Sequence, residues 1–344
     1  MDRPGKASAF AIEPPIEPML AKLADAIPEG DYLYEPKWDG FRAIVFRSAS
    51  DVYIQSRDSR PFDRYFPDLH EVFLARLPAG CVLDGEIVIA AKKGLDFDAL
   101  QMRLHPAASR VARLAKEMPA SFVAFDALAS RGKTLLQRSQ RERRAELETF
   151  LAKVEAPIHV TPATLDRSAA LRWLKDFEGA GLDGVVAKPL GLPYQPGKRA
   201  MLKIKHARTA ECVVVGFRWH KQGEGIVGSL LLGLYDDAGT LHHVGVTSSF
   251  DMATRRQLAK ELEPLRTGVA MPGEQSRWSV GRDTTWHELR PERVCEVKYD
   301  HLQGDRFRHA AIFLRWRPDK RPRDCRYDQL EVTRPYALKK IFSL

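Results

Sequence analysis

The sequence predicts an α+β protein with two domains. Its 344 residues are more than one domain usually needs and enough for two hydrophobic cores. In the first part of the chain, short β-branched and aromatic runs alternate irregularly with helical segments, without the regular rhythm of a Rossmann sheet. After about residue 205, short strand-like runs and glycine turns dominate. The predicted domains are therefore residues 1–207 and 208–344.

Five runs in the first domain are predicted as strands, because glycine, aspartate or proline punctuates runs of β-branched and aromatic residues. These runs are Tyr32–Glu35, Ala43–Phe46, Val52–Gln55, Cys81–Ala90 and Ser121–Ala127. Two helices are expected to begin after Ser139 and Ser168, each carrying apolar residues on one face. The heavily charged stretch 138–148 is expected to be a solvated face of the first of these helices.

The second domain is predicted to be an OB-type barrel. Strands are expected at Cys212–Phe217, Gly228–Tyr235 and His242–Thr247, and Asp251 can cap the helix that follows. Further strands come after the helix, and about five short strands interrupted by one helix are typical of that barrel.

Charge and cysteine usage narrow the class of protein. The net charge of +9 provides an excess of cations that a nucleic acid or another polyanion could use, although solubility alone would also account for it. The four cysteines lie far apart and form no CxxC pair, which argues against a zinc knuckle or a disulfide framework. No stretch approaches the roughly 18 apolar residues of a membrane span. We expect a cytoplasmic protein with no membrane association.

A lysine motif, Glu35-Pro36-Lys37-Trp38-Asp39-Gly40-Phe41-Arg42, is the first sign of chemistry. By itself this string favours an Asp-Gly turn beside a solvated lysine over a catalytic motif. Six further strings follow it in order along the chain. They are Ser56-Arg57, Leu83–Val88, Phe122–Asp126, Asp183–Lys188, Leu202–Lys205 and Arg315–Lys320.

This ordered set resembles the nucleotidyltransferase motifs of enzymes that form a covalent lysyl-AMP. Arg317-Pro318-Asp319-Lys320 is similar to the R-x-D-K signature of ATP-dependent DNA ligases, and the layout looks most like the small bacterial ligase C group. The resemblance implies an adenylyltransferase domain of the nucleotidyltransferase, ATP-grasp-like type followed by an OB-fold domain. It also implies ATP and Mg²⁺ (or Mn²⁺) as cofactors, and nicked duplex DNA as the substrate of a monomeric enzyme of DNA repair, with protein partners from that pathway.

The resemblance assigns the catalytic group to Lys37, Lys203, Lys205 and Asp39. Lys37 is the expected nucleophile. A lysine with the ordinary pKa of about 10.4 is almost wholly protonated at neutral pH, so nearby cations must favour its neutral form. Lys203, Lys205 and a bound Mg²⁺ would supply that cationic field and offset charge on the α-phosphate.

Nucleotide recognition is expected from residues of the same motifs. Glu35 would accept from the exocyclic amine of adenine, Phe125 would stack on one face of the base, and Val185 or Val186 would close the other. Arg42 would hold the ribose side, and Arg57 the 5′-phosphate of the nick.

Metal and pyrophosphate contacts are assigned in the same way. Asp183 and Glu86 are the carboxylates expected to place the metal, and Glu86 also the ribose. Asp183 stands where the motif usually has glutamate, so its shorter side chain needs a closer backbone or an intervening water to reach a metal. Arg317, Asp319 and Lys320 are implied to meet the β- and γ-phosphates when the second domain closes over the site.

Two alternative functions stay open from the sequence. An RNA ligase or capping guanylyltransferase would share the covalent chemistry, although Glu35 and the R-x-D-K string favour ATP and DNA. A non-catalytic OB-fold protein that binds nucleic acids would form no covalent AMP adduct, and mass spectrometry after incubation with ATP separates this alternative from the enzymes.

Overall fold

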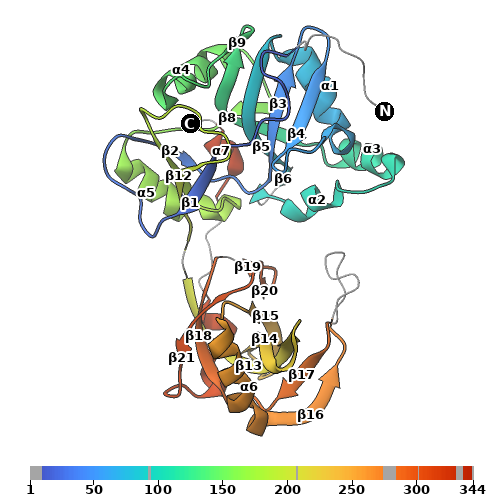
Figure 1. Ribbon diagram of the computed structural model, residues 1–344, viewed down its shortest axis with the longest axis vertical. Coiled ribbons are helices and arrows are strands. Elements are labelled where there is room, and N and C mark those ends of the chain that lie inside the picture. Colours follow the sequence, from blue (N-terminus) through green and yellow to red (C-terminus); the bar gives the residue numbers. More distant parts are fainter. Residues whose placement is uncertain are drawn as a thin grey trace. The chain divides into compact units, whose positions relative to one another are not determined.

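The computed structural model describes residues 10–91, 94–206, 208–273, 284–300, 302–330 and 336–342. The chain divides into two compact units, Met1–Lys205 together with Thr333–Leu344, and His206–Val332 (Figure 1). The first division lies close to the predicted one at 207/208. The end of the chain differs from the prediction of one domain over 208–344, because the described residues 336–342 pack with the first unit. The reason is burial of Leu338 and Ile341 in an apolar cluster of that unit.

Two sheets form the frame of the first unit. The four-stranded sheet has the order β1-β12-β11-β2, with bounds β1 (Leu20–Leu23), β12 (Arg199–Ile204), β11 (Val185–Pro189) and β2 (Tyr32–Pro36). The larger sheet has the order β10-β8-β5-β3-β4, and β9 pairs with β8. Its bounds are β10 (Ile158–Val160), β8 (Ser121–Ser130), β5 (Cys81–Val88), β3 (Phe41–Arg47), β4 (Val52–Ser56) and β9 (Lys133–Thr134). All five predicted strands are therefore present within a few residues of their expected limits.

Helices cover both sheets. The helices of the first unit are α1 (Pro67–Arg76), α2 (Phe97–Met102), α3 (Ala108–Glu117), α4 (Gln140–Leu151), α5 (Arg167–Asp176) and α7 (Leu338–Ile341). A short ribbon of β6 (Ala90–Ala91) and β7 (Gly94–Leu95) and two 3-10 turns, Asp63–Tyr65 and Phe177–Ala180, complete it. Phe73 of α1 meets Phe122 of β8 edge to face in the main core, while α5 packs on β2 and β11.

The helix caps agree with the sequence at one helix and differ at the other. Ser139 caps α4 as expected, and it does so in a capping box with Glu142. The cap of α5 is Asp166 and not Ser168, because the Asp166 carboxylate accepts from the backbone N–H groups of Ser168 and Ala169.

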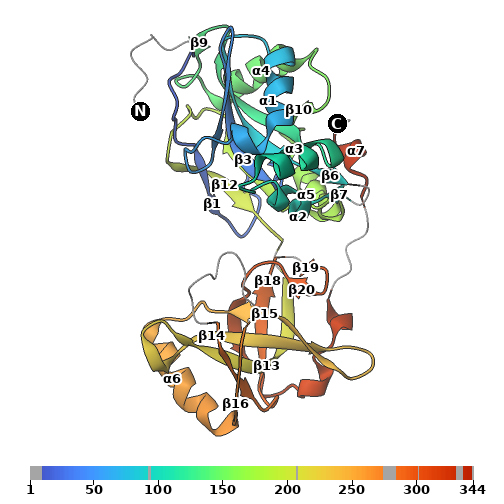
Figure 2. The same ribbon diagram turned by 90° about the vertical axis from the view of Figure 1, so that its right-hand side faces the viewer.

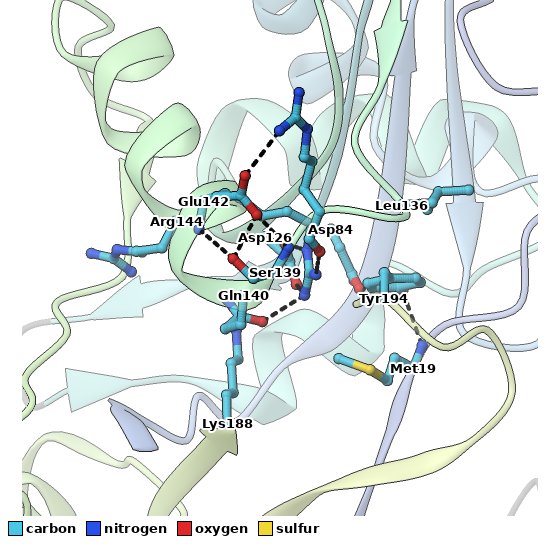
Figure 3. A network of polar contacts seen from close by, with 12 residues as sticks. Met19, Asp84, Asp126, Leu136, Ser139, Gln140, Glu142, Arg144, Lys188 and Tyr194 are labelled. Carbon is cyan, nitrogen blue, oxygen red and sulfur yellow. Dashed lines mark hydrogen bonds and ion pairs between the residues drawn. The ribbon is translucent and has the colours of Figure 1, made fainter. Parts of the chain in front are cut away.

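The expectation of a solvated face over 138–148 is wrong at three polar positions, Gln140, Arg143 and Arg144, which are buried. Arg143 is fully buried, and its guanidinium donates to both carboxylate oxygens of Asp126 at 2.8 and 3.0 Å. Gln140 accepts a third hydrogen bond from it at 2.7 Å, within the polar network of Figure 3. Arg144 is also buried, because α4 lies on β8 and turns these two side chains inward. A buried guanidinium is tolerated here since its donors are satisfied.

The second unit is a closed barrel with the strand pairing of an OB fold. The long, bent β13 (Arg208–His220) pairs with β14 (Gly223–Tyr235) on one edge, and with β18 (Val294–Tyr299) and then β17 (Trp286–Leu289) on the other. β15 (Leu241–Thr247) extends this sheet beyond β14, and β21 (Ile312–Trp316) extends it beyond β18. Ala311 donates to the carbonyl of Val246 at 2.8 Å, which closes the circle.

One helix and several short elements complete the barrel. The helix α6 (Met252–Leu262) is capped by Asp251 as expected and packs against β14 (Figure 2). The remaining elements are β16 (Arg266–Met271), β19 (Leu302–Gln303), β20 (Arg306–Phe307) and the 3-10 turns Glu263–Leu265, Pro322–Asp324 and Tyr327–Gln329. Among the described residues, no helix has the length and apolar character needed to cross a membrane. The predicted α+β class with a C-terminal OB-type barrel is confirmed.

Candidate active site

Lys37 follows directly after β2, where two backbone hydrogen bonds fix its position. Its N–H donates to the carbonyl of Gly184 at 2.8 Å, and its carbonyl accepts from the N–H of Asp183 at 2.9 Å. Gly184 has a φ of +133°, and a Cβ there would collide with the carbonyl of Ile204. Only glycine therefore allows the residue before β11 to approach the end of β12 this closely.

Side chains from three of the motifs, Lys37, Asp183 and Lys205, meet as an ion-paired triad. The Nζ of Lys37 lies 2.5 Å from Oδ2 of Asp183, and the Nζ of Lys205 lies 3.0 Å from the same oxygen. Burial raises the pKa of the Asp183 carboxyl. The charges of Lys37 and Lys205 lower this pKa by more than burial raises it, so the net pKa lies below the ordinary value. Asp183 is therefore ionised at neutral pH and holds both ammonium groups.

Three predicted residues form a row across the four-stranded sheet. Val186 lies opposite Glu35 on β2 and opposite Lys203 on β12, so these three side chains share one face. Val185 is fully buried on the other face beside Ile204. Of the two predicted valines, Val186 is thus on the side of the site. Burial, followed by the charge of Lys37, lowers the pKa of Lys203.

Glu35 is engaged differently from the sequence expectation. Its carboxylate is buried and lies 2.8 Å from the Nζ of Lys188 and 3.3 Å from Nη1 of Arg144. Burial raises its pKa, although Lys188 and Arg144 act in the opposite direction. In this structure both carboxylate oxygens therefore already have cationic partners. Neither partner was assigned a role from the sequence.

Phe125 lies between two cations at the edge of this row. Its ring is partly exposed, the guanidinium carbon of Arg42 lies 5.2 Å from the ring centroid, and Nζ of Lys188 lies 4.8 Å from it. Lys188 also donates to the carbonyl of Phe125 at 2.8 Å. Lys188 of β11 therefore contacts both the backbone and the ring of Phe125, and these two contacts fix the position of the ring.

Arg42 is fixed by residues that the sequence analysis did not single out. Its guanidinium donates to both oxygens of Asp84, at 2.9 and 2.6 Å. The hydroxyl of Tyr194 donates to Asp84 at 2.7 Å and accepts from the N–H of Met19 at 2.9 Å (Figure 3). This chain of contacts fastens the first described segment to β5.

Glu86 lies opposite Arg42 on the neighbouring strand. Burial raises its pKa to about 7, while Lys37 and Arg42 lower it less strongly. Asp183 and Glu86 therefore both act electrostatically on Lys37. Among the described residues no cluster of three or more His, Cys, Asp or Glu side chains could hold a metal by itself. Mg²⁺ commonly takes only one or two carboxylates and completes its shell with water and phosphate oxygens, so these two residues fit such an ion.

The two other predicted residues of the first unit lie in turns. Asp39 is between β2 and β3, two residues beyond Lys37. The next residue, Gly40, comes so close to the carbonyl of Ile87 that a Cβ would collide with it. Arg57 is exposed in the turn after β4, and its charge is among those that lower the pKa of Lys203.

Arg317, Asp319 and Lys320 form a separate cluster in the second unit, in the turn after β21. Arg317 donates to Asp319 at 2.7 Å, and this contact lowers the pKa of Asp319 to about 2. Arg317 also pairs with Glu211 of β13, and Lys320 lies 2.8 Å from the same carboxylate. Glu211 is itself fixed by Gln329, which accepts from its N–H at 2.7 Å.

Some of the overlooked residues could have been found from the sequence and others could not. Asp84 and Lys188 lie inside the motif strings, beside Glu86 and Val186, but received no role. Tyr194, Arg144 and Glu211 lie outside every motif, and their local sequence contains no signal of a partner more than 100 residues away.

A strand-end lysine that shares a carboxylate with a second lysine, in a chain with a separate OB-type barrel, is the arrangement of a covalent nucleotidyltransferase. The family models agree: one described as ATP dependent DNA ligase domain matches residues 18–205, and one described as ATP dependent DNA ligase C terminal region matches residues 223–320. The chain belongs to the ATP-dependent DNA ligases.

Individual relatives support the same family. DNA ligase C2 of Mycolicibacterium smegmatis is 54% identical over 336 residues, covering 92% of this chain and 95% of the relative. DNA ligase C of Mycobacterium tuberculosis is 54% identical over 340 residues, covering 93% and 95%. A solved Lig E DNA ligase shares the fold with a TM-score of 0.59 at 20% identity, covering 88% of this chain and 99% of that one. The resemblance to the small ligase C group is confirmed.

Proposed function

We propose that this ligase seals nicks between a 3′-hydroxyl and a 5′-phosphate in duplex DNA, with Lys37 as the nucleophile that carries AMP. The observation that carries the proposal is the approach of the Lys37 Nζ to within 2.5 Å of Asp183, with Lys205 on the same carboxylate. Lys37 must lose a proton before it attacks. Asp183 already accepts a hydrogen bond from that ammonium group and is therefore placed to accept the proton.

The reaction has three displacements at phosphorus. Nζ of Lys37 bonds to the α-phosphorus of ATP, and the bond to pyrophosphate breaks. An oxygen of the 5′-phosphate at the nick then takes the AMP, and the P–N bond to Lys37 breaks as the amine regains a proton. The 3′-hydroxyl finally attacks the 5′-phosphorus, loses its proton and releases AMP. Positioning and charge stabilisation outweigh acid-base catalysis in such steps.

The roles of the nucleotide-binding residues follow their places around Lys37. Phe125 and Val186 would enclose the adenine. Glu35 would accept from its exocyclic amine, a role that requires the carboxylate to share one oxygen between the base and Lys188, 2.8 Å away. Arg42, fixed on Asp84, would face the ribose, and the exposed Arg57 would meet the 5′-phosphate of the nick.

Asp183 and Glu86 would hold Mg²⁺ or Mn²⁺ together with phosphate oxygens and water. When bound, the ion withdraws charge from the α-phosphate and so favours departure of pyrophosphate. Lys203 and Lys205 would add to that stabilisation from the protein side. Asp39, in the turn between β2 and β3, would be the fourth member of the catalytic set, with Lys37, Lys203 and Lys205.

Arg317, Asp319 and Lys320 would contact the pyrophosphate part of ATP in the first step. Since pyrophosphate leaves before the nick is engaged, these residues would have no partner in the later steps. The remaining surface of the second unit would then bind DNA, and the net charge of +9 of the whole chain suits a polyanionic partner. We propose that the enzyme acts as a monomer in the cytoplasm, in DNA repair.

Incubation with labelled ATP, followed by mass spectrometry, tests the proposal. The wild-type chain should gain one AMP, and the Lys37→Ala variant should gain none, because the variant lacks the attacking amine. The same variant should still close a nick that already carries 5′-AMP. Lys22→Ala, which removes a lysine on an exposed strand position, is the matched control and should keep the adduct. A labelled adduct on Lys37→Ala would show that the nucleophile is a different residue.

A further inference from the structure

The C-terminal segment, residues 336–342, lies against the first unit directly behind the nucleophile. Figures 1 and 2 both draw α7 among the elements of that unit. Leu338 and Ile341 are buried there in a cluster with Trp38, Phe177 and Leu182. A four-residue helix has no stability of its own in water, so burial of these side chains holds it in place.

Phe342 makes the most specific contact of this segment. Its ring stacks on Trp38 with a centroid distance of 5.2 Å and an interplanar angle of 10°. It also stacks on His159 of β10 at 3.9 Å and 19°. Stacked aromatic pairs are directional, so the ring of Phe342 fixes the plane of Trp38 as well as its depth.

The residues under this segment are the neighbours of the reacting pair. Trp38 follows Lys37 in the chain, and Leu182 precedes Asp183. The backbones of Lys37 and Asp183 are joined by a hydrogen bond of 2.9 Å. A shift of Trp38 or Leu182 therefore moves the ammonium and its carboxylate relative to the rest of the site.

Trp38 also links the segment to the base-recognition side. Its Nε1 donates to Oγ1 of Thr161 at 2.8 Å. The carbonyl of Thr161 accepts from Arg144 at 2.8 Å, and Arg144 pairs with Glu35. One packed chain of contacts thus connects the C-terminal segment with both Lys37 and Glu35.

We propose that residues 336–342 are a positioning element for the first step, which holds Lys37 in line with the α-phosphate through Trp38. This inference rests on the proposed role of Lys37 as the nucleophile. Phe342 is a positioning residue and touches neither ATP nor DNA. Since a misplacement of about 1 Å can cost about 10²-fold in rate, loss of the element slows the transfer of AMP to Lys37.

The test compares single-turnover adenylylation across ATP concentrations for wild type, Phe342→Ala, Phe342→Trp and a chain that ends at residue 335. Phe342→Ala and the shortened chain should lose about 10-fold or more in the rate at saturating ATP, with KM for ATP changed less than about threefold. Phe342→Trp should recover most of the rate, because it restores a stacked ring. All variants should close a nick that already carries 5′-AMP, since this step does not use Lys37.

Two controls keep the test decisive. Phe73→Leu weakens the main core, a different cluster from the one that contains Trp38, and should lower the melting temperature without lowering the saturating rate. Lys340→Ala changes an exposed position of α7 and should resemble wild type. The proposal is overturned if the shortened chain adenylylates at the wild-type rate, or if Phe342→Trp is as slow as Phe342→Ala. Adduct formation by Lys37→Ala would instead overturn the proposed function, so the two failures are distinct.

Discussion

The ammonium of Lys188 lies 2.8 Å from the carboxylate of Glu35, and both side chains are about 97% buried. Arg144 provides the second cationic partner at 3.3 Å. A buried carboxylate is costly unless it is paired, so Glu35, the proposed base-recognition residue, depends on two cations of the protein itself.

Lys188→Met is expected to destabilise the first unit. Removing one partner of a buried ion pair costs about 3–5 kcal/mol, and the value here should fall at the lower end because Arg144 remains. Unfolding in urea measures the change. Lys175→Met, at an exposed position of α5, should change stability by less than about 0.5 kcal/mol. Equal effects of the two substitutions would contradict the importance of the pair.

Glu86 should give the ligand-free chain a measurable pH dependence of stability. Burial raises the pKa of this carboxyl from its ordinary value of 4.5 to about 7, so its neutral form is favoured in the fold. The corresponding stabilisation is complete below the unfolded pKa and is lost as pH rises through about 7. Relative to Glu86→Gln, the wild type should lose about 3 kcal/mol between these limits. Urea unfolding of both proteins across this range, without ATP or metal, measures it. A constant difference would argue against the shift.

Lys320→Ala and Arg57→Ala should affect opposite halves of the reaction. Lys320 would touch only the leaving pyrophosphate, so its loss should slow adduct formation by about 10²-fold and leave closure of a pre-adenylylated nick nearly unchanged. Arg57 would touch the 5′-phosphate of the nick, so its loss should do the reverse. Single-turnover rates of the two steps provide the comparison. Equal loss of both steps in both variants would point to a general folding or orientation defect instead.

Glu211→Gln should favour the first step at low ATP concentration. The carboxylate of Glu211 pairs with Arg317 and lies 2.8 Å from Lys320, so it competes with pyrophosphate oxygens for the same two cations. A neutral amide of the same size competes less strongly, and KM for ATP in adduct formation should fall by about two- to fivefold, less than the loss of a full charge-assisted contact. Initial rates at a series of ATP concentrations measure KM. A rise in KM would show that Glu211 chiefly orients the cations.

Local sequence was enough to predict the strands and the order of the motifs. Runs such as Val52–Gln55 and Ser121–Ala127 have the composition of strands. Each run begins where the observed strand begins and ends within three residues of the observed end. The residue that caps α5 was harder to predict, since Asp166 and Ser168 are both good capping residues and lie two positions apart. Only the geometry of the backbone selects between them.

The sequence by itself determined which residue types stand around Lys37, because the motifs that carry them are short and contiguous. Tertiary structure decided which of these side chains are already paired and what supports them. Arg143 and Arg144 lie in the charged first half of α4, yet packing of this helix on β8 buries both, against Asp126 and Glu35. The C-terminal residues follow the barrel in sequence, but their apolar side chains are buried against Trp38 in the first unit, and removal of this apolar surface from water stabilises that position. The pairing of Arg144 with Glu35 and the packing of the C-terminal residues on Trp38 join residues more than 100 positions apart. Burial of apolar surface and of charge, which acts over the whole fold, selects such contacts.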